Sequence, residues 1–91
     1  MITYTAGYQI DTDGVHAEVL DFPGVLSCGA DLAEARDMLA DALVGMAELA
    51  LEAGETLPKP TPTVSSPAFD VIEPIHLCLS ATSADNAGAV A

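Results

Sequence analysis

One short stretch, residues 21–35, constrains this chain more than any other, because it encodes a turn, a strand and the start of a helix in direct succession. The Pro-Gly pair at 23–24 is a turn signal. The apolar run at 25–28 is typical of a short strand. Asp31, followed three residues later by Glu34, has the spacing of a helix-capping pair. We therefore expect a helix to start immediately after the strand.

The residues before this stretch predict two further strands. Residues 2–10 alternate apolar and polar side chains, the pattern of a half-buried strand, and they contain no acidic residue. A turn at 11–14 ends in Gly14, where a positive φ is favoured, and residues 15–20 form the return strand. Together with the strand at 25–28 these make an antiparallel meander with one face that needs a cover.

The cover is a helix predicted over residues 32–53. Asp31 is the expected N-cap, Gly54 the residue that ends the helix, and Pro58 prevents its continuation. We expect both Gly24 and Gly29 to have positive φ angles, where a Cβ is penalised. The predicted core face of the helix comprises Ala35, Met38, Leu39, Ala42, Leu43, Met46, Leu49 and Ala50.

The remaining helix positions form two stripes at helical spacing. Five acids lie along one narrow line and are the candidate partner-binding residues: Glu34, Asp37, Asp41, Glu48 and Glu52. A second apolar set is the candidate oligomer interface: Ala40, Val44, Ala47 and Leu51. The alternative for this second set is a surface of small residues without a binding role.

After the helix the chain changes character twice. Residues 58–67 are rich in proline and predict an extended connection. Residues 68–80 are strand-like, with Pro74 marking either the start of a strand or an edge position. We assign residues 1–80 to one α+β domain of order β-β-β-α-β, with one helix on a small mixed sheet, and expect a disordered tail at 81–91.

The central stretch resembles the core motif of HicB-type antitoxins. The matching positions are Phe22, Pro23, Gly24, Gly29, Glu34 and Ala35, with Asp31 as the helix cap between them. The resemblance covers residues 1–62. It implies a truncated ribonuclease H-like fold in which a single helix packs on a mixed sheet.

The same resemblance implies a function in protein binding. HicB-type antitoxins neutralise HicA-type toxins, small basic ribonucleases that cleave mRNA, by covering their active and RNA-binding surface. Many family members add a C-terminal DNA-binding segment. Here the residues after Ser80 contain no basic side chain and no helical pattern, so direct DNA binding is doubtful. The alternative is a solitary HicB-like oligomeric protein with a regulatory role and no toxin partner.

Composition points in the same direction. The 91 residues include 14 acidic and 2 basic ones, for a net charge of -12. Such a chain repels phosphate backbones and attracts basic proteins, although simple solubility is the alternative explanation. A single small domain has a modest core, so we expect a homodimer or a higher homo-oligomer.

No catalytic or metal-binding pattern is apparent. A ribonuclease H-type nuclease needs several carboxylates converging on Mg²⁺. The opening strand offers none, so Glu34, Asp37 and Asp70 lack the strand carboxylate with which they would form a metal site. The two histidines and two cysteines lack metal-ligand spacing. We expect no enzyme activity, no cofactor and no metal. The absence of a signal peptide or membrane span predicts a cytoplasmic protein with reduced thiols.

Overall fold

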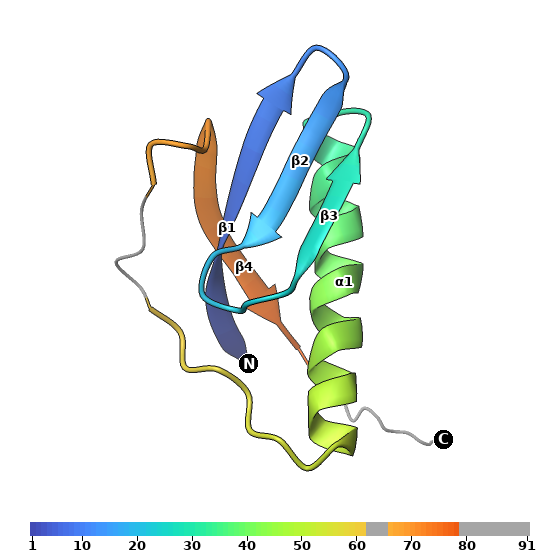
Figure 1. Ribbon diagram of the computed structural model, residues 1–91, viewed down its shortest axis with the longest axis vertical. Coiled ribbons are helices and arrows are strands. Elements are labelled where there is room, and N and C mark those ends of the chain that lie inside the picture. Colours follow the sequence, from blue (N-terminus) through green and yellow to red (C-terminus); the bar gives the residue numbers. More distant parts are fainter. Residues whose placement is uncertain (62–65, 79–91) are drawn as a thin grey trace.

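The computed structural model describes residues 1–61 and 66–78, which form four strands and one helix (Figure 1). The helix packs against one face of a single sheet whose strand order is β3-β2-β1-β4. This confirms the predicted α+β class and element order. The elements are β1 (Ile2–Asp11), β2 (Gly14–Val19), β3 (Leu26–Gly29), α1 (Leu32–Glu52) and β4 (Val71–Leu77).

Every strand pair in the sheet is antiparallel, so the expectation of a mixed sheet is wrong. β4 lies beside β1 as expected, but Ile2 faces Leu77 and Tyr8 faces Val71. The reason is where β4 begins. The chain leaves α1 at one end of the sheet, yet just before β4 the N–H of Asp70 donates to the carbonyl of Tyr8, near the opposite end (Figure 1). β4 therefore runs back against β1.

Pro74 lies in the middle of β4, at an edge of the sheet, as one of the two sequence-based alternatives proposed. It faces Thr5, whose N–H and carbonyl bond to Asp21 and Leu20 on the other side of β1. No ladder hydrogen bond is therefore required of Pro74, and its missing N–H costs the sheet nothing. A proline on an exposed edge also discourages pairing with further strands.

The hydrophobic core lies between α1 and the sheet face that turns toward it. On the helix the fully buried positions recur every four residues, at Ala35, Leu39, Leu43 and Ala47. Small side chains at both ends of this row allow the helix to lie close to the sheet. The strands and turns supply the other buried apolar side chains, which are Tyr4, Ala6, Tyr8, Val15, Ala17, Val19, Phe22, Val25, Ile75 and Leu77.

Both ends of α1 are closed by local hydrogen bonds, as the sequence predicts. The Asp31 carboxylate accepts the N–H of Glu34 at 2.8 Å, and the Glu34 carboxylate accepts the N–H of Ala30 at 2.6 Å. At the other end the chain turns at Gly54, with a φ of 78°. There the N–H of Glu55 donates to Ala50 and that of Gly54 to Leu51, which is a Schellman motif.

The two glycines of the central stretch have different roles. Gly24 has the expected positive φ of 90°. The same expectation for Gly29 is wrong, because Gly29 is an ordinary strand residue paired with Val15. Glycine is needed at position 29 because the backbone of the first helical turn lies very close to it. A Cβ at this position would lie 2.5 Å from the backbone nitrogen of Ala35, which is closer than packing allows.

We expect Gly29→Ala to destabilise the fold by about 1–3 kcal/mol, because the added methyl group collides with the backbone of the first helical turn. The matched control is Gly45→Ala. A Cβ there meets nothing within 4 Å, and alanine favours a helix, so a gain of about 0.5–1 kcal/mol is expected. Denaturant unfolding of both variants measures the difference. Equal effects of the two substitutions would contradict this account of Gly29.

Candidate protein-binding surface

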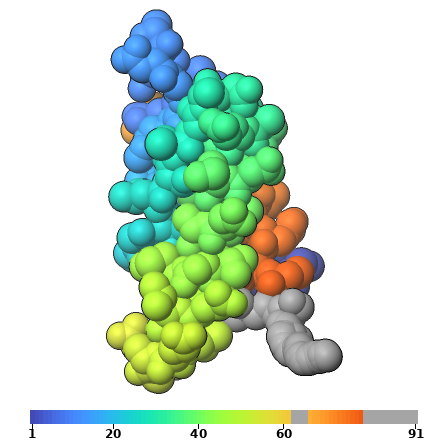
Figure 2. Space-filling view, turned by 90° about the vertical axis from the view of Figure 1, so that its right-hand side faces the viewer, coloured from blue at the N-terminus to red at the C-terminus, as the bar shows by residue number. Residues whose placement is uncertain are grey.

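The five acids of the predicted partner-binding set lie on the outer surface of α1. All five are exposed, on the side of the helix opposite its buried row. We call these five residues the acidic stripe; they are Glu34, Asp37, Asp41, Glu48 and Glu52. In Figure 2 the helix runs down the middle of one face of the molecule, with β3 on one side and β4 on the other. The acidic stripe therefore lies along the centre of this face.

One of the four residues predicted to form an oligomer interface is buried, and the assignment of the other three stays a prediction. Ala47 belongs to the core with no exposed surface, so its assignment to an interface is wrong. The reason is the rotation of α1 about its axis, which places Ala47 on the helix face that packs against the sheet. Val44 is half-buried, whereas Ala40 and Leu51 are exposed. We call Ala40, Val44 and Leu51 the β4-side strip. Ala40 and Val44 follow Arg36 at intervals of four residues and so lie on the same side of the helix, where Arg36 pairs with Glu73 of β4.

The same rotation exposes side chains that the sequence assigned to the core. Met38 is 47% exposed and Leu49 is 62% exposed. Ala42 and Met46 between them are half-buried, and Met46 lies beside Gly24 at the turn that leads into β3. These four residues form a β3-side strip that runs parallel to the acidic stripe. The sequence did contain a signal for it, since the helix carries more apolar side chains than one sheet can cover.

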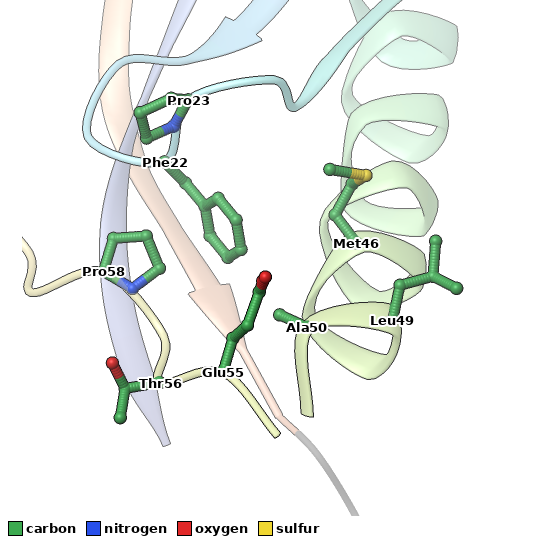
Figure 3. Close-up of a pocket in the computed structure, with 8 residues that line it drawn as sticks. All are labelled: Phe22, Pro23, Met46, Leu49, Ala50, Glu55, Thr56 and Pro58. Atoms are coloured by element: carbon green, nitrogen blue, oxygen red, sulfur yellow. The ribbon is translucent and has the colours of Figure 1, made fainter. Parts of the chain in front are cut away.

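The β3-side strip ends in a groove between the last turns of α1 and the segment that follows the helix (Figure 3). Its volume is about 370 Å³. Its apolar lining comes from the Phe22–Pro23 turn, the helix and Pro58, and Glu55 points its carboxylate into the space (Figure 3). The complete lining is Phe22, Pro23, Met46, Leu49, Ala50, Glu55, Thr56 and Pro58.

A buried carboxylate fixes the far wall of this groove. Asp21, only 8% exposed, accepts the N–H of Thr5 and the N–H of Thr61 through its two oxygens, both at 2.8 Å. The Tyr4 hydroxyl donates to the carbonyl of Pro58 at 2.7 Å. Burial, and then the nearby Asp21 charge, raises the pKa of Tyr4, so this hydroxyl keeps its proton and remains a donor. The segment after the helix is thus held to β1 directly at Pro58 and, through the Asp21 carboxylate, at Thr61.

One of the two basic residues is already used inside the fold. Arg36 makes a two-pronged ion pair with Glu73 of β4, at 2.8 Å for each hydrogen bond, and lies 6.0 Å from the ring centre of Tyr8. Burial raises the pKa of Tyr8, and Glu73 adds to the effect. Together these contacts fasten the first half of α1 to β4.

The carboxylates weighed for nuclease chemistry are not assembled into a site. Asp70 accepts the N–H of Ile10 at 2.7 Å and so extends the pairing of β1 with β4, while Glu34 is engaged at the helix cap. Among the described residues, no group of three or more histidine, cysteine, aspartate or glutamate side chains could hold a metal ion. Cys28 and Cys78 are both free and exposed. Within this same part of the chain, no helix is long and apolar enough to cross a membrane.

We expect Asp21→Ala to destabilise the protein by about 1–3 kcal/mol or more, because two backbone N–H groups lose their acceptor. Hydrogen exchange should accelerate at Thr5 and Thr61. The control is Asp13→Ala at the exposed tip of the β1–β2 hairpin, which should change neither property. Unchanged exchange at Thr61 in the Asp21 variant would show that the carboxylate does not hold this wall of the groove.

Comparison with known proteins finds solved structures with a similar fold but no close relative by sequence. No protein-family model and no curated protein matches the chain. Among solved structures, the N-terminal domain of the antitoxin HicB from Burkholderia pseudomallei aligns over 86% of this chain and 100% of its own, with a TM-score of 0.67 and 24% identity. The crystal structure of that HicB antitoxin aligns over 100% of this chain and 76% of its own, with a TM-score of 0.74 and 23% identity.

A chain from a HicA3 and HicB3 toxin–antitoxin complex is also similar. It aligns over 82% of this chain and 96% of its own length, with a TM-score of 0.67 and 16% identity. The resemblance that the central motif indicates is therefore confirmed at the level of the fold.

Proposed function

We propose that this chain is a HicB-type antitoxin that binds and neutralises a small basic HicA-type toxin. The observation that carries the proposal is the shared fold, with TM-scores of 0.67 to 0.74 to structures described as HicB antitoxin and as a HicA3–HicB3 complex. The central motif supports it independently, because its turn, close packing and cap all occur at the positions that the resemblance gives.

The proposed mechanism is steric and electrostatic. The acidic stripe is exposed along the full length of α1, and the chain as a whole carries a net charge of -12. A basic ribonuclease needs its positive surface to hold RNA, and a complementary acidic face competes directly for that surface. Charge complementarity also accelerates association and helps to exclude wrong partners.

On this proposal the chain is not an enzyme and acts in the cytoplasm without a cofactor or a metal. The fold match to antitoxins supports a binding role. Residues 81–91, for which the sequence predicts a disordered tail, lie outside the described part of the structure, and the proposal assigns no DNA-binding role. The alternative is a solitary HicB-like protein that regulates by oligomeric binding and has no toxin partner.

The test uses a short basic protein as the candidate toxin, to be sought first in the reading frames beside the one that encodes this chain. We expect equimolar addition of this chain to stop its cleavage of mRNA. We also expect the association rate to fall at least tenfold between 0.1 M and 1 M salt, because the Debye length shortens from ~10 Å to ~3 Å. Stopped-flow mixing measures the rate at each salt concentration.

Two matched double variants test which surface of the chain accelerates association with the toxin. Asp37→Asn with Asp41→Asn removes two charges from the acidic stripe, and Asp11→Asn with Asp13→Asn removes two from the hairpin tip. All four acids are exposed. The stripe variant should associate several-fold more slowly than the tip variant. Continued mRNA cleavage in the presence of the chain would reject the antitoxin function, and equal rates for the two variants would reject the stripe as its surface.

We further propose that the chain forms a two-fold homodimer through the β4-side strip. Support comes from the exposure of Ala40 and Leu51 and from the modest core of a small domain. Light scattering at micromolar concentration should give a dimer mass. Leu51→Glu should give a monomer, whereas Leu26→Glu, at a similarly exposed site on the other sheet face, should not. A monomeric wild type would reject the dimer.

A further inference from the structure

We propose that the groove at the end of α1 receives an arginine or lysine side chain of the partner. The aliphatic stem packs on Phe22, Met46 and Leu49, and the cationic head pairs with the carboxylate of Glu55. This inference rests on the proposed binding of a basic partner and names the place where one of its basic side chains is held.

The walls of the groove suit a long aliphatic stem. Leu49 is 62% exposed, the largest exposed fraction among the large apolar side chains of α1, and it lines the outer edge of the groove, with its side chain extending away from the Phe22 ring (Figure 3). Met46 adds a flexible thioether that adapts to the shape of its neighbour. Arginine and lysine bury their stems against surfaces of this kind while the charge stays near water.

Glu55 makes the groove selective for a cation. Its carboxylate points between the Phe22 ring and the helix, and the described residues include no hydrogen bond or ion pair to it (Figure 3). The last turn of α1 has no basic residue, so the negative end of the helix dipole adds to this charge. An uncharged apolar occupant would cover the carboxylate without pairing it, which is costly.

The chain is poorly equipped to fill this site itself. It has two basic residues, and Arg36 is already held by Glu73. Lys59 is therefore the one lysine or arginine side chain that a second copy could still offer. Charge complementarity thus favours a foreign, basic protein over a homodimer contact at the groove.

The site is also formed before binding. The Schellman motif at Gly54 fixes the direction in which the chain leaves the helix, and Glu55 is part of that motif. The hydrogen bonds of Asp21 and Tyr4 hold the opposite wall. A site that is already ordered loses less entropy when it is occupied.

A peptide titration tests the groove without any toxin. The probes are a blocked Leu-Arg-Leu peptide and the same peptide with neutral citrulline in place of arginine, each followed by amide chemical shifts of the full chain. We expect shifts centred on Phe22, Met46, Leu49 and Glu55. The arginine peptide should bind about two- to fivefold more tightly, as one exposed ion pair allows.

Glu55→Gln should abolish this preference, whereas Asp13→Asn, the same charge change at the hairpin tip, should retain it. Equal binding of the two peptides, or shifts centred on another surface, would overturn the proposal. Because Glu55→Gln and Asp13→Asn change the net charge equally, general attraction to an acidic protein would affect both variants alike and cannot imitate the expected difference.

The second arm measures the affinity of this chain for the same candidate toxin. Leu49→Ala should weaken binding about tenfold, the size expected when one apolar anchor of an interface is truncated. The control is Leu26→Ala, whose side chain is 55% exposed on the other face of the sheet. If the wild type binds and inhibits but Leu49→Ala and Glu55→Gln behave as their controls do, the groove proposal fails and the antitoxin proposal stands. If the peptide preference holds but no inhibition occurs, the antitoxin function alone fails.

Discussion

The backbone contact between the end of β3 and the first turn of α1 sets the rest of the structure. Gly29 lies so close to Ala35 that no Cβ fits between them. Asp31 and Glu34 close the helix start at the same place, and their hydrogen bonds leave it little freedom to turn. The rotation of α1 about its axis follows from this contact, and that rotation decides which side chains meet the sheet and which face solvent.

The rotation of α1 divides the helix surface into zones of different character. The buried row at Ala35, Leu39, Leu43 and Ala47 places the acidic stripe on the opposite side, toward solvent. Two apolar strips are left between these zones, one toward β3 and one toward β4. A basic protein that docks on this face would meet charge along the centre and apolar anchors at the margin. In protein interfaces generally, apolar anchors give most of the affinity, while charges give specificity and rate.

Much of the fold could be predicted because its signals are local. The strands at 2–10 and 15–20, the helix cap at Asp31 and the helix end at Gly54 each depend on residues close together in the sequence. The exposure of the acidic stripe followed from helical period alone. Periodicity failed for Ala47, Met38 and Leu49, because a helix with apolar residues around most of its circumference has several equally apolar faces. The groove at Glu55 was missed because its walls come from three separate segments.

The sequence by itself determined the elements, their caps, the charge and the motif that indicates a HicB-like fold, since all of these are written in neighbouring or periodically spaced residues. Tertiary structure alone decided three things: the antiparallel direction of β4, the rotation of α1, and the position of the Glu55 carboxylate in an apolar groove. The direction of β4 and the far wall of the groove depend on contacts between residues far apart in the chain, namely Asp70 with Tyr8 and Asp21 with Thr61. The rotation of α1 depends on how closely the backbone at Gly29 packs against Ala35, a distance that hydrophobic periodicity does not encode.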